Sequence, residues 1–182
     1  YGLALTARRL DRLEALAADL AKTYGVEVIP IAADLADVGA VDAILAAITA
    51  KGRVVDVLVN NAGYGLPGTW SETDWASQAV VLQVMLTAPL ELSHKVLAGM
   101  KARKFGRILN IASLAGFAPG GRGHTTYGAI KSALIKFSQS LNLEMDGTGV
   151  HATAVCPGFT YSEFHDVNGS RDRVSVLPKY MW

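Results

Sequence analysis

The fold of this chain is decided around residues 54–63, which read VVDVLVNNAG. Residues 54–59 are mostly β-branched and apolar, which is typical of a strand buried in a parallel sheet. The strand ends in the turn formers Asn60 and Asn61, which are poor strand residues. Ala62 and Gly63 follow and leave room for a ligand to approach the backbone. This pattern predicts an α/β protein with a possible binding site at the end of the strand.

Strand-like and helix-like segments alternate on both sides of this stretch. We expect strands at 3–6, 26–32, 54–59, 107–112 and 150–156, and helices at 9–24, 38–51, about 71–103 and 126–145. Pro89 predicts a kink or a break in the third helix. This alternation predicts a doubly wound parallel sheet with helices on both faces. Residues 157–182 show no clear period and are expected to form a loop.

The composition is that of an ordinary globular domain. The chain has 182 residues, of which 51% are hydrophobic and 18% charged, with a formal net charge of +1. The length fits one domain over 1–182, and the hydropathy excludes disorder. The charge gives no support for binding to nucleic acid or to anionic membranes, and the apolar stretch 79–92 is too short for a span of roughly 20 residues.

Cys156 is the single cysteine in the sequence, so no internal disulfide is possible. That count fits a reducing compartment, and no secretory signal pattern is visible at the first residues. We therefore expect a cytoplasmic protein.

The residues that follow each expected strand are candidates for a site, because ligands of open α/β sheets bind at the carboxyl ends of the strands. Arg8 and Arg9 follow the first strand, where they either bind an anion or form a solvated helix start. Asp34, followed by Leu35, comes after the second strand, and either caps the next helix or bonds the amine of an adenine. The pair Pro157–Gly158 follows the fifth strand and would line the same crevice.

Ser113, Tyr127 and Lys131 form the most chemically suggestive set. Tyr127 and Lys131 are four residues apart and share one face of the expected helix. A phenol with a pKa near 10 is a poor acid at neutral pH, and a fixed ammonium lowers that pKa by stabilising the phenolate. Tyr127 can then exchange a proton with a carbonyl or alcohol oxygen, and Ser113 can bond the same oxygen. Taken singly, each of these residues is also common in purely structural roles.

The conjunction of these motifs resembles the short-chain dehydrogenase/reductase family. The motifs that carry the resemblance are Asn60-Asn61-Ala62-Gly63, Ser113 with Tyr127-x-x-x-Lys131, and Pro157-Gly158, in the family's order and rough spacing. The resemblance covers essentially the whole chain. It implies a three-layer α/β/α Rossmann-type fold, a nicotinamide dinucleotide and hydride transfer between that cofactor and a carbonyl or alcohol.

The resemblance also implies a role for each motif residue. Tyr127 would be the acid/base, Lys131 would lower its pKa and bind the nicotinamide ribose, and Ser113 would position the substrate oxygen. Arg8 matches the basic position that holds a 2′-phosphate in similar reductases, so NADP(H) is expected rather than NAD(H). The implied cofactor-binding residues are Arg8, Asp34, Leu35, Asn60, Ala62, Gly63, Tyr127, Lys131, Pro157 and Gly158.

Two departures from the family pattern affect these expectations. The glycine-rich pyrophosphate loop is absent from the sequence and would belong before residue 1, together with a strand that lies between those at 3–6 and 54–59. We therefore expect the natural protein to be longer at its N-terminus and beyond Trp182, and these two strands to lack a shared neighbour. Met85 also stands where the family often has an Asn that holds a proton-relay water.

The substrate is expected to contact the region 157–182. Its apolar and aromatic side chains favour an apolar or aromatic carbonyl compound, unless they pack the loop or a subunit interface instead: Phe159, Tyr161, Phe164, Leu177, Tyr180, Met181 and Trp182. The alternatives to an oxidoreductase are a non-catalytic relative that binds cofactor or a partner, and a sugar-nucleotide epimerase of the extended family. The resemblance further implies a homodimer or homotetramer.

Overall fold

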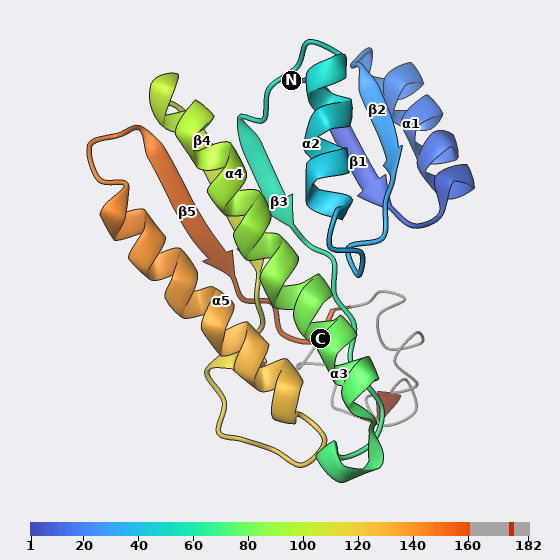
Figure 1. The fold of residues 1–182 in the computed structure, drawn as a ribbon, viewed down its shortest axis with the longest axis vertical. Helices are drawn as coiled ribbons and strands as arrows, with labels where there is room; N and C mark the ends of the chain where they lie inside the picture. Colours follow the sequence, from blue (N-terminus) through green and yellow to red (C-terminus); the bar gives the residue numbers. More distant parts are fainter. Residues whose placement is uncertain (161–174, 177–182) are drawn as a thin grey trace. The chain divides into compact units, whose positions relative to one another are not determined.

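A computed structural model of the chain describes residues 1–160 and 175–176 (Figure 1). The chain folds as two compact units, Tyr1–Val55 (unit 1) and Asp56–Trp182 (unit 2). Each unit is described by itself below.

Unit 1 is a pair of parallel strands flanked by helices (Figure 1). Its elements are β1 (Leu3–Ala7), α1 (Leu10–Tyr24), β2 (Val28–Ala32) and α2 (Ala40–Ala50). Helix α1 ends at Gly25, whose φ of 64° gives the left-handed conformation that glycine adopts without a Cβ penalty. Ile31 of β2 packs with Ile44 and Ile48 of α2 as the buried cluster of this unit.

Unit 2 is a three-stranded parallel sheet covered by two long helices. Its sheet order is β3-β4-β5. The elements in chain order are β3 (Val57–Asn60), η1 (Trp70–Glu72), α3 (Trp75–Leu82), η2 (Gln83–Thr87), α4 (Ala88–Ala102), β4 (Gly106–Ile111), η3 (Leu114–Gly116), α5 (Thr125–Glu144) and β5 (Val150–Val155).

Helices α4 and α5 lie on the same face of this sheet (Figure 1). Asn60 of β3 and Asn110 of β4 are register partners, so their side chains point to the same face. Asn60 bonds Ser93 of α4, whereas Asn110 bonds Ser138 of α5. Both helices must therefore cover that face.

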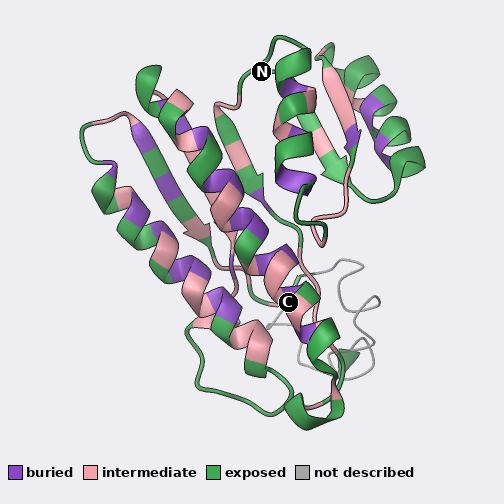
Figure 2. Ribbon diagram, viewed as in Figure 1, coloured by how far each residue is buried: buried purple, intermediate pink, exposed green. Residues whose placement is uncertain are grey.

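The alternation of burial along the strands agrees with this arrangement. Figure 2 shows β5 alternating between buried residues such as Val150 and exposed ones such as His151. On the face away from the helices, Val57 and Val59 of β3 are 43% and 53% exposed. Within the described part of unit 2, helices α4 and α5 thus cover the face that carries Asn60 and Asn110.

The predicted parallel α/β fold is confirmed, with strands and helices in the expected order and ends within a few residues of those expected. The strands form two sheets, β1-β2 and β3-β4-β5, and no strand pairing in the described ranges joins β1 to β3. The single-domain boundaries over 1–182 stay a prediction.

The buried face of α5 is not the one that hydrophobic spacing suggests. Ala129, Ala133, Phe137 and Leu141 recur at four-residue spacing along the helix. Of these only Leu141 is buried, and the helix instead packs through a neighbouring stripe that includes Ile130, Leu134 and Ser138. The reason is that two polar side chains, Lys131 and Ser138, take buried hydrogen bonds that a pattern based on hydrophobicity does not count.

The predicted break at Pro89 takes the form of a π-helical turn, η2, between α3 and α4. Pro89 has no backbone N–H, so the helix loses one of its regular bonds there. Just before it, the Ala88 N–H donates to Gln83 O, five residues back. The whole segment Trp75–Ala102 is long and apolar enough to cross a membrane, yet 44% of its most apolar window is buried within the fold. Such burial is what a helix covering a sheet shows.

The turn before β5 packs closely against the backbone at Lys104, and this contact can be tested. Gly147 and Gly149 both have positive φ, 71° and 81°, but an added Cβ at Gly149 would overlap the Lys104 carbonyl oxygen while one at Gly147 meets nothing within 4 Å. We expect Gly147→Ala to lower the free energy of unfolding by about 1 kcal/mol, from backbone strain alone. Gly149→Ala should cost at least about 2 kcal/mol more. Denaturant titration of both variants measures the difference, and equal losses would contradict the described contact.

Candidate active site

Ser113, Tyr127 and Lys131 come together at the carboxyl end of β4. Ser113 lies two residues beyond the strand and caps η3, its Oγ accepting from Ala115 N at 3.1 Å. Tyr127, in the first turns of α5, is hydrogen-bonded to the Ser113 side chain. Lys131 Nζ lies 5.5 Å from the centroid of the Tyr127 ring and donates to Ile111 O at 2.6 Å. The three residues that the sequence singles out thus form one cluster.

The cluster is held by close packing between η3 and α5. A Cβ on Gly116 would lie 2.8 Å from the backbone carbon of Lys131, so only glycine allows this approach. Ser132 donates its hydroxyl to Gly116 O, and Leu114 N donates to Pro157 O at 3.1 Å. The segments that carry Ser113, Lys131 and Pro157 are therefore tied directly to one another.

A buried glutamine supports the start of α5. Gln78 of α3 is 6% exposed, accepts the Thr126 hydroxyl and donates to Thr73 Oγ1 at 2.6 Å. Thr126 precedes Tyr127, so Gln78 helps to set the position of that phenol. On the other side, the His124 ring lies edge-on to Tyr127 at 6.5 Å. Sequence reasoning missed Gln78, although a glutamine among apolar residues on a helix is the signal that marks it.

Burial sets the charge states of the cluster. Burial raises the pKa of Tyr127 above its ordinary value of 10, and the hydrogen bond to Ser113 opposes that shift. Burial therefore dominates in the chain by itself, and the lowering of this pKa by Lys131 stays a prediction. Burial also lowers the pKa of Lys131 to about 8, opposed by a coulombic interaction with Cys156. At neutral pH the site holds a phenol with its proton and an ammonium.

Asn60 belongs to a buried network of side chains. Its Nδ2 donates to Asn110 Oδ1 at 2.8 Å, and to Pro89 O and Ser93 Oγ at 3.3 Å. Asn110 in turn donates to Ser138 Oγ at 2.9 Å. The amide nitrogen of Asn60 is thus used to join β3, β4 and α4, which is a structural role beside the predicted cofactor contact.

The rest of the turn after β3 is only partly open. Ala62 is exposed. A Cβ on Gly63 would lie 3.3 Å from Met85 Cε and 3.8 Å from Lys131 Nζ. The room expected at Gly63 is therefore taken on this side by two of the chain's own side chains.

The remaining candidates lie after β5 and in unit 1. Pro157 is half-buried and Gly158 exposed beside Leu114. Arg8 is exposed directly after β1. Asp34 accepts from Ala36 N at 3.0 Å, so it closes a turn rather than capping α2, which begins at Ala40. Leu35 packs against the buried cluster of unit 1.

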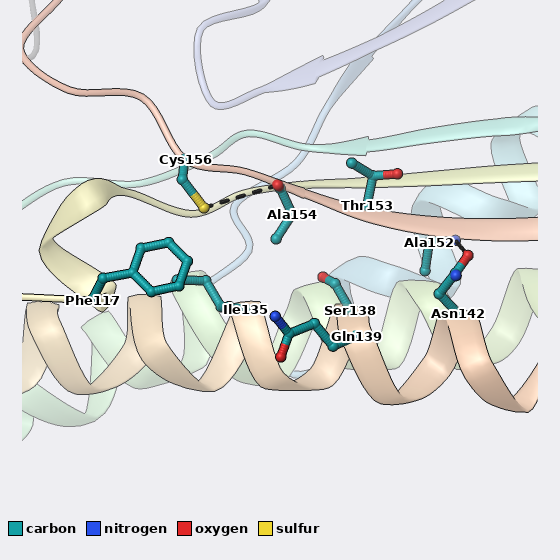
Figure 3. Close-up of a pocket in the computed structure, with 9 residues that line it drawn as sticks. All are labelled: Phe117, Ile135, Ser138, Gln139, Asn142, Ala152, Thr153, Ala154 and Cys156. Carbon is teal, nitrogen blue, oxygen red and sulfur yellow. Dashed lines mark hydrogen bonds between the residues drawn. The ribbon is translucent and has the colours of Figure 1, made fainter.

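A pocket of about 260 Å³ lies between α5 and β5 (Figure 3). Cys156 Sγ approaches Ala154 O at 3.9 Å on its wall. The lining residues are Phe117, Ile135, Ser138, Gln139, Asn142, Ala152, Thr153, Ala154 and Cys156. None of the predicted site residues lines it, so the chemistry of the cluster, rather than the size of a hollow, marks the candidate site.

Comparison with known proteins agrees with this geometry. A family model described as short chain dehydrogenase matches residues 1–172. An uncharacterized oxidoreductase of Myxococcus xanthus is 35% identical over 88% of this chain, and a sulfoacetaldehyde reductase of Chromohalobacter salexigens is 34% identical over 96%. A solved short-chain dehydrogenase from Sphingobium yanoikuyae in complex with NADPH superimposes on 98% of the chain and 68% of its own, with a TM-score of 0.90 and 33% identity.

This chain belongs to the short-chain dehydrogenase family, a family of NAD(P)-dependent oxidoreductases with a Rossmann-type fold. The chain spans 63% and 69% of the length of the two curated relatives. The activity of the whole protein is therefore a proposal, set out below.

Substitution of two adjacent asparagines, Asn60 and Asn61, tests the structural role of Asn60 apart from any role in cofactor binding. In the protein without cofactor, we expect Asn60→Ala to lower the free energy of unfolding by about 1–3 kcal/mol. The reason is that the buried partners of the Asn60 amide each lose a hydrogen bond. The matched variant Asn61→Ala, at an exposed position without such bonds, should change it by less than about 0.5 kcal/mol. Denaturant titration measures both. An Asn60→Ala protein as stable as the parent would show that the network contributes little.

Proposed function

We propose that this protein transfers a hydride between NADP(H) and an apolar carbonyl or alcohol compound, with Tyr127 as the acid/base. The observation that carries the proposal is the hydrogen-bonded pair Ser113–Tyr127 with the ammonium of Lys131 at 5.5 Å from the phenol ring. This arrangement combines a proton donor, a second hydrogen-bond donor and a cation at one strand end.

The proton step follows from the charge states of the cluster. Burial keeps the pKa of Tyr127 above its ordinary value, so the phenol holds its proton until negative charge develops on a substrate oxygen. Ser113 bonds the same oxygen as that charge grows. The ammonium of Lys131 then stabilises the phenolate that Tyr127 becomes, and in the reverse direction the phenolate takes the proton from an alcohol.

The cluster fits a nicotinamide cofactor by its donor set. A buried ammonium anchored on Ile111 O and a phenol stand beside the short side chains of the turn after β3, at the carboxyl ends of parallel strands. When bound, the nicotinamide supplies or takes the hydride. Tyr127 and Lys131 would hold its ribose, and Ala62, Gly63, Pro157 and Gly158 would line its path. In unit 1, Asp34 and Leu35 would contact the adenine and Arg8 the 2′-phosphate.

A preference for NADP(H) is supported by the exposed Arg8 guanidinium and by the NADPH complex of the Sphingobium relative. An arginine binds a phosphate group with two parallel, charge-assisted hydrogen bonds. The bare ribose hydroxyl of NAD(H) offers no such partner, so Arg8 favours the phosphorylated cofactor.

An apolar substrate is supported by the surface beside Ser113. Leu114, the first residue of η3, and Phe117, directly after it, are 56% and 62% exposed, and Phe159 lies half-buried after β5. Large exposed apolar side chains close to reactive groups are typical of binding sites for apolar compounds. The other aromatic residues of the predicted substrate region (Tyr161, Phe164, Tyr180 and Trp182), with Leu177 and Met181, lie outside the described residues.

The proton role of Tyr127 has a direct test. Tyr127→Phe keeps the ring but removes the acid, so we expect NADPH-dependent reduction of apolar ketones to fall by at least about 100-fold. Tyr24→Phe, at a 70% exposed tyrosine, should leave the rate unchanged. Turnover is followed by the absorbance of NADPH with a panel of apolar and charged carbonyl compounds.

The outcomes of this test separate the alternatives. Undiminished turnover by Tyr127→Phe would refute the acid/base assignment. Cofactor binding without turnover on any carbonyl or alcohol would favour the non-catalytic relative. A preference for small charged substrates would contradict the apolar substrate class.

The role of Arg8 predicts a change in cofactor choice. We expect Arg8→Ala to raise the KM for NADPH by at least roughly tenfold, because the variant loses charge-assisted bonds that contribute about 1.5 kcal/mol or more, with the KM for NADH unchanged. Lys22→Ala removes an exposed cation from the last turn of α1 and serves as the matched control. Steady-state kinetics with both cofactors measures the ratio. An equal effect on both cofactors would remove Arg8 from the 2′-phosphate site.

The homodimer or homotetramer, the cytoplasmic location and the longer natural chain stay predictions.

A further inference from the structure

Met85, in the η2 turn, packs its side chain against the turn after β3. It is 1% exposed. Its Sδ accepts a hydrogen bond from Tyr64 N at 3.4 Å. Its Cε lies 3.3 Å from the point where a Cβ on Gly63 would sit. The thioether is therefore packed directly onto residues 63–64.

Lys131 Nζ borders the same point, at 3.8 Å. The lysine is 5% exposed, and the part of the chain that the structure describes provides it with one hydrogen-bond acceptor, Ile111 O. An ammonium carries three N–H donors. One side of the ammonium therefore faces the space around Gly63, and what occupies that space affects its solvation.

We propose, on the basis of the function above, that Met85 is a positioning residue, whose thioether excludes water from the Lys131 ammonium and holds residues 63–64 against it. A thioether has no donor and is only a weak acceptor, so it cannot replace the lost water. It is also flexible enough to fill an irregular gap completely.

The chain places Met85 there through its backbone. The π-helical turn Gln83–Thr87 is one residue wider than an α-helical turn and is centred on residue 85, just before Pro89. Such turns re-aim the side chains of a helix and are frequent at functional sites. Because Pro89 lacks an N–H, regular α-helical bonding through this point is not possible.

Exclusion of water should be visible in the titration of Lys131. Burial disfavours the ammonium and lowers the pKa of Lys131 to about 8. The titratable groups that face it among the described residues are Tyr127 from α5 and Cys156 after β5, with His124 beyond Tyr127. Tyr64 belongs to the turn that Met85 touches. Of these, Cys156 acts to raise the pKa, so it opposes the effect of burial.

The experiment compares Met85→Asn with Met85→Leu in the full-length protein without cofactor. Lysine labelled with carbon-13 is followed by NMR, and the Lys131 signal is identified by its loss in Lys131→Arg. The polar Asn admits water beside the Lys131 ammonium. We therefore expect the titration midpoint of Lys131 to rise by about half a pH unit or more in this variant. Leu keeps the space apolar at similar volume and should leave the midpoint where it is.

Each outcome decides the proposal. A folded Met85→Asn protein with an unchanged midpoint overturns it, as does a Leu variant that shifts as much as the Asn variant. If Met85→Asn does not fold, Met85→Gln, which is closer to Met in length, replaces it under the same criteria. NADPH oxidation is measured in parallel across pH, and its alkaline limit should move with the midpoint. A shifted midpoint in a protein that never oxidises NADPH supports water exclusion and overturns the proposed oxidoreductase function instead.

Discussion

The hydrogen bond from Asn60 to Asn110, 2.8 Å long and buried between two paired strands, is the interaction on which unit 2 depends. Each of the two amides also reaches a serine on the covering helices, Ser93 on α4 and Ser138 on α5. Breaking these hydrogen bonds is costly, because no water reaches the buried polar groups to take the place of the lost partner. They hold both helices over the carboxyl ends of β3 and β4, where the candidate site lies.

The site gains its chemistry from the same burial that stabilises the fold. Lys131 is buried in the helix face that packs on the sheet, where its ammonium donates a hydrogen bond to Ile111 O at 2.6 Å. Tyr127, one turn earlier, keeps its proton because it too is withdrawn from water. The packing of the fold thus sets the protonation states of the phenol and the ammonium. Met85 belongs to this design, because an apolar side chain beside the lysine withdraws it further from water.

Much of the fold and the site was predictable from local pattern. Runs of β-branched residues mark buried strands, turns follow them, and the spacing of Tyr127 and Lys131 puts both on one side of a helix. The buried face of α5 was not predictable, because Lys131 and Ser138 are polar and a hydrophobic pattern discards them. The structural role of Asn60 was not predictable either. Its partners, Asn110 and Ser93, are 50 and 33 residues away, and local spacing carries no information about such contacts.

The sequence by itself determined the α/β class, the family and the three residues that meet at the end of β4. These depend on residue types at short spacings, and the regular backbone of a helix or strand converts such spacings directly into positions. Only the tertiary structure decided the charge states of Tyr127 and Lys131, the structural duty of Asn60 and the contact of Met85 with the turn after β3. The physical reason is that protonation and hydrogen-bond choice depend on exclusion of water, and water is excluded by residues that are distant in the chain and brought together by folding.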